Sequence, residues 1–390
     1  MIQRKEKIDT LTHKVNTWNP KKIKDIFEFK YIDIASVDRD SKEITDSQSI
    51  LTSDAPSRAR QLIQDGDVLV STVRPNLNAV AYVTSQDEGA TASTGFTVLR
   101  ADKKNLDPRY LYYWVRTPYF VDDMTRKSTG ANYPAVSDSI IKNSKIPLPP
   151  IAEQKRIAEI LDKADAVRRK RQEAIRLTEE LLRSTFLEMF GDPVTNPKGW
   201  DVAQIRQLGK VITGNTPPRS DPSNYGDGIE WIKSDNITVP NHFLTEASER
   251  LSSQGKKIAR IAPKNSVLVT CIAGSKSSIG RAGIADREVA FNQQINAIIP
   301  NPNVSYYFLY SQILVAQNLV QQKSTNSMKG MVNKKKFSEI LLLNPPFEIQ
   351  QKFSDIFIRI MSLTKKTNSN LTESENLFNS LLQRAFRGEL

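Results

Sequence analysis

Two stretches of the chain carry the hydrophobic spacing of long amphipathic helices. In residues 151–190 and 347–386, apolar side chains recur mostly three and four positions apart, as a packing stripe on a helix requires. A Pro-Pro pair precedes each stretch, and Gly191 or Gly388 lies at or near its end, which is typical of helix boundaries. The spacing predicts two helices of about 40 residues, each about 60 Å long. The positions assigned to the two stripes include Val167, Leu181, Leu363 and Leu377.

The two helical stretches also resemble each other, position by position and without a gap. Pro149 aligns with Pro345, Gln154 with Gln350 and Leu181 with Leu377. The parts upstream of the helices match in the same order, for example residues 67–72 with 266–271. The chain is therefore an internal twofold repeat, in which a globular part and a long helix occur twice.

The globular parts show short strand-like runs followed by a helical pattern. The runs in the first part are 31–37, 67–73, 80–84 and 96–99, with a helix over 108–119; the second part repeats this order and ends in a helix over 304–321. We therefore expect an α+β protein with two mixed α/β domains. The predicted boundaries are 1–145, 146–192, 193–340 and 341–390, where the second and fourth ranges hold the long helices.

A long helix with one apolar stripe needs a partner, and its own repeat is the simplest one. The two helices are separated by a whole domain, so we expect them to pair as an antiparallel coiled coil. The centre of each stripe is polar, at 168–171 and 365–368. The favoured interpretation is a solvated or weakly packed centre, and the alternative is a basic surface that faces a DNA backbone.

Composition removes several classes of protein. The chain has one cysteine and two histidines, so intramolecular disulfides, cysteine-rich zinc sites and histidine-based catalysis are not expected. No apolar run is long enough for a membrane span, and the N-terminus does not resemble a signal peptide, so we predict a cytoplasmic protein. The net charge of +12 indicates a polyanionic partner. Most of the excess positive charge lies in residues 193–340, with a cluster at 334–336, which predicts unequal DNA binding by the two domains.

Two motifs suggest an enzyme, and both are weak. Residues 344–347 read Asn-Pro-Pro-Phe, as in adenine-N6 DNA methyltransferases, but their repeat counterpart is Leu-Pro-Pro-Ile and no Gly-rich cofactor turn follows a strand. Residues 28–30 read Glu-Phe-Lys, a minimal nuclease pattern. We predict no catalytic residue, no metal and no cofactor. A single-chain methyltransferase or nuclease remains the alternative, and a helical scaffold without a DNA role is a third possibility.

The remaining chemistry is that of binding loops, which present side chains suited to base edges and phosphates. Two loops occur in both halves: 71–78 matches 270–278, and 127–133 matches 323–329. A third loop, 213–219, has no clear equivalent in the first half. The candidate DNA-binding residues are Arg74, Asn76, Asn78, Lys127, Ser128, Asn132, Tyr133, Thr216, Arg219, Ser275, Lys276, Ser277, Ser327 and Lys329.

One family matches these features. Residues 147–162, PLPPIAEQKRIAEILD, closely resemble the start of the central helix in specificity subunits of type I restriction–modification systems, and residues 384–390, RAFRGEL, resemble their C-terminal ending. The resemblance covers nearly the whole chain and includes the repeat order. The second copy departs from the pattern, since residues 348–350 read Glu-Ile-Gln in place of Ala-Glu-Gln.

The resemblance implies that two target recognition domains each bind one half of a split double-stranded DNA sequence. It implies that the paired helices set the spacing between the halves and dock methyltransferase subunits in two copies, which supply cofactor and catalysis. Whether a restriction and translocation subunit joins stays open. The candidate partner-binding residues are Gln154, Arg156, Glu159, Gln350 and Lys352.

Overall fold

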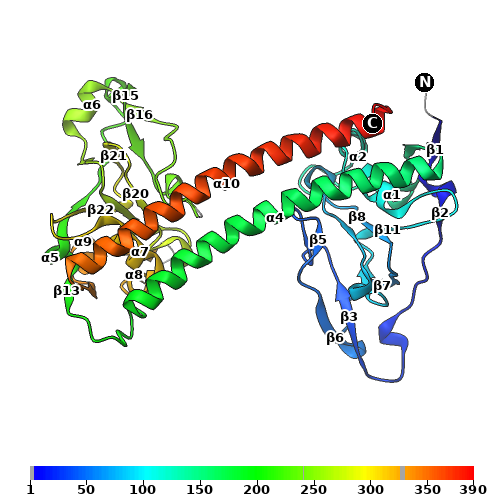
Figure 1. Ribbon diagram of the computed structural model, residues 1–390, viewed down its shortest axis with the longest axis horizontal. Coiled ribbons are helices and arrows are strands. Elements are labelled where there is room, and N and C mark those ends of the chain that lie inside the picture. Colours follow the sequence, from blue (N-terminus) through cyan, green and yellow to red (C-terminus); the bar gives the residue numbers. More distant parts are fainter. Residues whose placement is uncertain (1–3, 240, 326–329) are drawn as a thin grey trace. The chain divides into compact units, whose positions relative to one another are not determined.

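The computed structural model describes residues 4–239, 241–325 and 330–390, which form two compact units. The first unit holds residues 1–172 and 369–390, and the second holds 173–368. Each unit therefore combines one globular part with a segment of both long helices, α4 (Ile151–Phe190) and α10 (Phe347–Arg387) (Figure 1). The two predicted helices are confirmed to within one residue at their ends.

The first unit holds fifteen elements before α4 besides its short 3-10 turns, counted over its described residues. They are β1 (Lys5–Lys7), β2 (Thr12–His13), β3 (Glu28–Ile32), β4 (Val37–Asp38), β5 (Glu43–Ile44), β6 (Gln48–Leu51), β7 (Ala59–Leu62), β8 (Val68–Ser71), β9 (Val80–Tyr82), β10 (Thr91–Ser93), β11 (Phe96–Ala101), α1 (Pro108–Trp114), α2 (Pro118–Lys127), α3 (Asp138–Lys142) and β12 (Lys145–Pro147).

The second unit repeats this order with small additions. Its elements between α4 and α10 are β13 (Val202–Gln204), α5 (Ile205–Leu208), β14 (Gly209–Thr213), β15 (Tyr225–Ile232), β16 (Arg250–Leu251), α6 (Ser253–Ile258), β17 (Ile261–Ala262), β18 (Val267–Thr270), β19 (Ile272–Ala273), β20 (Ala282–Ile284), β21 (Val289–Phe291), β22 (Ile295–Pro300), α7 (Tyr306–Val315), α8 (Gln317–Gln322), β23 (Gly330–Met331), α9 (Lys334–Ser338) and β24 (Leu341–Leu343).

Sheet topology confirms the internal repeat. Each unit has two four-stranded sheets, ordered β6-β3-β10-β7 and β2-β11-β8-β9 in the first unit and β16-β15-β21-β17 and β14-β22-β18-β20 in the second. In both units one strand pair is parallel, β3 with β10 and β15 with β21. A short antiparallel pair, β1 with β12 or β13 with β24, lies next to the Pro-Pro segment. The mixed α/β domains and the repeat are thus established at the level of topology.

The long helices pair antiparallel within each unit. In the first unit the start of α4 contributes Ile157 and Leu161 to a buried cluster that also contains Phe378 and Leu382 from the end of α10. In the second unit the end of α4 packs on the start of α10, where the Phe186 and Phe353 ring centroids are 5.5 Å apart. The backbone ends of α4 follow the predicted signals, because Gly191 has φ of 78° and its N–H donates to Leu187 O at 2.8 Å.

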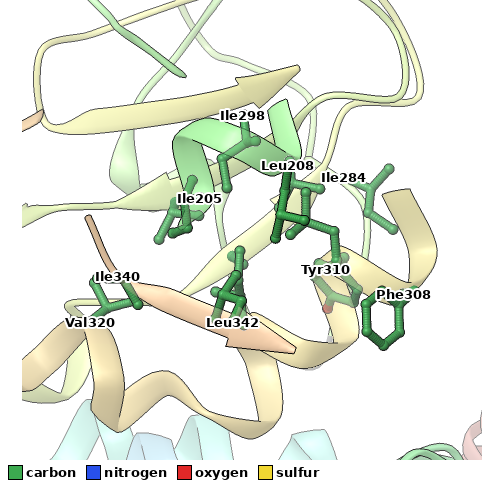
Figure 2. Packing of buried hydrophobic residues seen from close by; sticks show 14 of the residues in the cluster. Ile205, Leu208, Ile284, Ile298, Phe308, Tyr310, Val320, Ile340 and Leu342 are labelled. Carbon is green, nitrogen blue, oxygen red and sulfur yellow. The ribbon is translucent and has the colours of Figure 1, made fainter. Parts of the chain in front are cut away.

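The core of the second unit joins its small elements to the sheet. Figure 2 shows Ile205 and Leu208 of α5, Phe308 of α7 and Leu342 of β24 converging on one buried cluster, to which Ile298 of β22 also belongs. All five side chains are at most 3% exposed. Burial of this size stabilises the unit by about 1.5–3 kcal/mol per large apolar side chain.

Two sequence interpretations of the helices need correction. Val167, Leu181, Leu363 and Leu377, assigned to the packing stripes, are 47%, 50%, 53% and 58% exposed. The run 168–171 is not a solvated centre, apart from the exposed Lys170. Arg168 and Arg169 pair with Asp165, and Arg171 donates to α10 of the same unit. The run 365–368 is mostly exposed, as the favoured interpretation expects.

Some strand boundaries were also wrong. The run predicted over 31–37 ends as a strand at Ile32, because the chain turns there: the Asp33 carboxylate accepts the N–H groups of Ala35 and Ser36 at 2.9 and 3.0 Å. The helix predicted over 108–119 is two helices, since Pro118 begins α2 after Thr117, whose hydroxyl caps it.

Candidate nucleic-acid interface

In the first unit the structure brings two predicted loops together. The backbone N–H of Arg74 donates to Pro134 O at 2.7 Å, and Val73 forms a bridge with Ala135. The Arg74 guanidinium lies over the Tyr133 ring, 4.7 Å from its centroid. The Tyr133 ring is 69% exposed, so this cation–π pair lies at the surface. Arg and Tyr in this arrangement can contact bases by hydrogen bonding and by stacking.

The backbone of the first loop is held in an uncommon conformation. Arg74 and Asn78 have φ of 48° and 45° and flank a 3-10 turn over Pro75–Leu77. Non-glycine residues with such φ cost about 1–3 kcal/mol each and cluster at binding sites. The exposed Asn76 is carried at the tip of this turn.

A lysine from the β4–β5 hairpin holds the end of the loop 71–78 by a hydrogen bond. Lys42 Nζ donates to Asn78 O at 2.5 Å, and Asn78 Nδ2 donates to Val115 O at 3.4 Å. Burial, together with the neighbouring positive charges of Arg116 and Arg168, lowers the pKa of Lys42 from 10.5 to about 8. The Asn78 amide thus faces α1 and supports the loop, and its contact with DNA stays a prediction. Lys42 was missed, since only the tertiary fold brings it to this loop.

The other predicted residues of the first unit lie around the second loop. Lys127 pairs with Asp123 at 2.6 Å, and the Ser128 hydroxyl donates to Thr125 O. Asn132 is exposed beside Tyr133. Lys127, Asn132 and Tyr133 are thus exposed, whereas Ser128 caps the end of α2.

The second unit joins its two corresponding loops in the same way. Strand β19, which follows β18, pairs with β23. The N–H of Val332 donates to Cys271 O at 2.8 Å. Lys276 is exposed, and the hydroxyls of Ser275 and Ser277 hydrogen-bond to each other at 2.5 Å. Ser327 and Lys329 lie outside the described residues. Both units therefore unite the two loops that the sequence paired across the repeat.

Cys271 lies under this loop and is inert. Its side chain is 2% exposed, and burial raises the pKa of the thiol to about 12. Asn296 Nδ2 donates to Sγ at 3.2 Å. A thiol in this state neither attacks a substrate nor binds a metal.

The third predicted loop is held by ion pairs and ring contacts. Arg219 donates to both carboxylate oxygens of Glu249, at 2.8 and 3.0 Å, and its guanidinium lies over the rings of Tyr225 and Trp231. These hydrogen bonds, together with one from Lys233, lower the pKa of Glu249 to about 2. Thr216 hydrogen-bonds to Gln293. Arg219 is therefore ion-paired within the fold, although it shares the Glu249 carboxylate with Lys233.

The glutamine of each Pro-Pro motif has an internal role in place of the predicted partner contact. Gln154 Oε1 accepts the N–H of Asp107, and its Nε2 donates to Asn105 O and Pro149 O at 3.0 and 2.9 Å. Gln350 Oε1 accepts the N–H of Ser305, and its Nε2 donates to Pro345 O. Both side chains are at most 1% exposed. Each glutamine fastens the start of α1 or α7 to a long helix.

The other predicted partner-binding residues lie at the surface. Glu159 and Lys352 are exposed. Arg156 is exposed too, donates to Glu153 and reaches Leu390 O at 2.8 Å, which ties the start of α4 to the end of α10. These three stay predictions.

The enzyme-like motifs have structural roles. Asn344 donates its N–H to Asp201 O, Pro345 is buried, and Phe347 begins α10. In the Glu28-Phe29-Lys30 motif, Glu28 accepts from Ser49 and Lys30 pairs with Asp87 at 2.6 Å. Among the described residues, no group of three or more His, Cys, Asp or Glu could hold a metal ion. No helix of the described ranges is both long and apolar enough to cross a membrane.

Comparisons with known proteins show the family and the fold of the chain. The family model described as the type I restriction modification DNA specificity domain matches residues 16–178 and 197–373. The HindI specificity subunit of Haemophilus influenzae is 24% identical over 86% of this chain and 89% of its own length. The MjaIX specificity subunit of Methanocaldococcus jannaschii is 21% identical over 94% and 85%.

Two solved structures share the architecture. A chain from a study of complex assembly and conformational transition of the type I restriction–modification system is 25% identical, with a TM-score of 0.60, and the match covers 99% of this chain and 98% of that one. The type I system S subunit from M. genitalium is 14% identical with a TM-score of 0.58, which shows the fold alone, over 98% and 96%. None of these comparisons supports a single-chain methyltransferase or nuclease.

Proposed function

Because the chain belongs to the type I restriction–modification DNA specificity family, we propose that each unit reads one half of a split DNA target through its paired loops. As a specificity subunit it recognises DNA and assembles with methyltransferase subunits. The loops 71–78 and 127–133 serve the first half, and the loops 270–278 and 323–329 serve the second.

The observation that carries this proposal is the repeated joining of the same two loops. Separate backbone contacts hold them together in each unit, through Arg74 and Pro134 in the first and through Cys271 and Val332 in the second. A rigid composite surface reads bases more sharply than two independent loops, since little entropy is lost on binding. Two similar readers in one chain suit a target made of two half-sites.

The helices supply two equivalent surfaces for assembly. Val167 and Leu363 occupy the same repeat position, as do Leu181 and Leu377, and all four are about half exposed. The first unit holds Val167 and Leu377, and the second holds Leu363 and Leu181. Exposed apolar side chains at matched positions support docking of two copies of one partner, which is the methyltransferase subunit.

Catalysis belongs to the partner in this proposal, and the chain contributes no catalytic group and no cofactor site. The purified chain should transfer no methyl group from labelled S-adenosylmethionine to DNA, whereas the chain with its methyltransferase subunit should modify a split sequence. Methyl transfer by the chain alone would overturn the proposal.

Copy number has its own test. Native mass spectrometry should give two methyltransferase subunits per chain. Val167→Asp in the first unit and Leu363→Asp in the second should each remove one copy, whereas Ser184→Asp, at an exposed polar position of α4, should remove none. Loss of both copies from either variant would contradict two independent surfaces.

A further inference from the structure

The segment between β2 and β3 occupies the place in the first unit that the Arg219 loop occupies in the second. Thr17 bridges to Gln61 of β7, and in the second unit Asn215 Oδ1 accepts the N–H of Arg260, next to β17. The residues that follow match as Pro20-Lys21 and Pro218-Arg219. The sequence comparison found no such equivalent, because only these two pairs of residues are alike.

This segment is held firmly at both ends. The Trp18 N–H donates to Arg60 O at 2.9 Å, and its indole N–H donates to Thr91 Oγ1 at 3.0 Å. The Trp18 ring stacks on Phe27, with centroids 6.1 Å apart and 14° between the planes. Thr52 closes the far end, since its N–H donates to Phe27 O at 3.0 Å. Residues 19–26 between these anchors are therefore presented on a fixed frame.

The exposed face of this frame is basic and apolar. Lys21, Lys22 and Lys24 are exposed, and within the described residues none of the three forms an ion pair. Their charges are thus available, whereas Arg219 is held in an ion pair with Glu249. Beside them Ile26 is 68% exposed and Ile23 and Phe27 are nearly half exposed. Asp25 is the acidic residue within the segment.

We propose that residues 19–27, the lysine turn, bind the sugar–phosphate backbone of double-stranded DNA. This inference rests on the proposed function and adds a site to it. Free ammonium groups on a preorganised turn neutralise phosphates, and the adjacent apolar side chains suit contact with sugars. Such contacts raise affinity for any sequence and position the first unit, while the paired loops supply base preference.

The test measures salt dependence with the full chain in complex with its methyltransferase subunit. The variant Lys21→Gln/Lys22→Gln/Lys24→Gln is titrated against a target duplex and a scrambled duplex over a series of KCl concentrations. We expect the slope of log K against log salt to fall by about 2–3, at about 0.9 per phosphate contact. The preference for target over scrambled DNA should stay unchanged, as should the melting temperature, because these side chains form no hydrogen bond or ion pair with any described residue.

A matched control removes the same charge elsewhere in the first unit. Lys7, Lys103 and Lys104 are exposed and carry no ion pair among the described residues, so Lys7→Gln/Lys103→Gln/Lys104→Gln should keep the wild-type slope. An unchanged slope in the lysine-turn variant overturns the inference, as does an equal fall in the control. Loss of methyltransferase from the variant, with its slope intact, would assign the turn to a protein partner. If the wild-type complex binds neither duplex, the proposed function itself fails.

Discussion

The two units fasten a similar recognition domain to the long helices by contacts that are only partly shared. In the first unit Asp165 of α4 is buried and pairs with Arg116, Arg168 and Arg169, and Arg116 also lies over the ring of Phe378. The repeat counterpart of Asp165 in the second unit is Met361. An aromatic join is common to both units, with the Phe190 and Phe308 centroids 4.7 Å apart in the second and the Tyr110 and Phe386 centroids 4.8 Å apart in the first. The ion-pair cluster around Asp165 is an addition of the first unit. The repeat therefore preserves topology and leaves the packing chemistry free.

The short strand before each long helix also forms different hydrogen bonds in the two units. In the second unit Gln312 bonds both backbone groups of Leu343, accepting at 2.6 Å and donating at 3.2 Å. In the first unit the counterpart of Leu343 is Pro147, which has no N–H. The Pro147 carbonyl accepts a hydrogen bond from the Tyr110 hydroxyl at 2.9 Å. Each unit satisfies its buried polar groups with the side chains it has, as folding requires.

The largest expected effect comes from a substitution that removes the ion-pair cluster around Asp165. Asp165→Ala leaves three arginines without their buried counter-charge, so we expect a loss of about 3–5 kcal/mol in the free energy of unfolding of the first unit. Calorimetry of the variant measures it. Met361→Ala is the comparison, with a smaller loss because that side chain is only partly buried. Equal losses would show that the two joins do not differ as described.

Both units share a buried glutamine after the Pro-Pro pair, and its substitution should destabilise each unit. Gln154→Ala and Gln350→Ala each leave buried backbone groups without partners, at a cost of about 1–3 kcal/mol. The loss should be larger for Gln154, which makes three hydrogen bonds where Gln350 makes two. Denaturant unfolding distinguishes them, and Gln351→Ala, at an exposed neighbouring position, should be near neutral.

The two globular parts should also differ in how much their positive charge contributes to DNA binding. Neutralising the exposed lysines of 193–340 should lower the salt slope more than neutralising those of 1–145, because most of the excess positive charge lies in the second globular part. Binding isotherms over a salt series provide the measurement. An equal fall from both sets would contradict unequal contributions.

The smallest effects are two pH windows, one in each unit. Lys42 has a pKa lowered from 10.5 to about 8 in the folded state, so stability should rise with pH between those values, and Lys42→Met should flatten that rise. Glu249 has a pKa lowered from 4.5 to about 2, so its contribution is present above pH 4.5 and is lost as pH falls to 2. Glu249→Gln should remove that acid-side loss, which is small because the pair is well exposed to solvent. Unfolding curves across pH measure both, and an alkaline rise that survives in Lys42→Met would contradict the first.

The long helices, their boundaries and the repeat were predictable because they rest on local rules: Pro-Pro pairs, spacing of three and four, and glycine ends. The exposure of Val167 and Leu363 was not predictable, since the spacing of apolar residues does not show which of them the other long helix covers. The loop pairs were predictable as candidates, but the contact of Arg74 with Tyr133 depends on tertiary structure. The role of Gln154 was misjudged because two of its three hydrogen-bond partners are backbone groups distant in sequence.

The most direct test of the central claim is methylome sequencing of a host that carries the gene with one loop pair altered. For Arg74→Gln/Tyr133→Ala, the account predicts a split methylated motif in which one half is relaxed and the other half and the spacing are unchanged. The complementary variant Lys276→Gln/Ser277→Ala should relax only the other half. Changes in both halves from either variant, or a motif that is continuous, would contradict the assignment of one half-site to each unit.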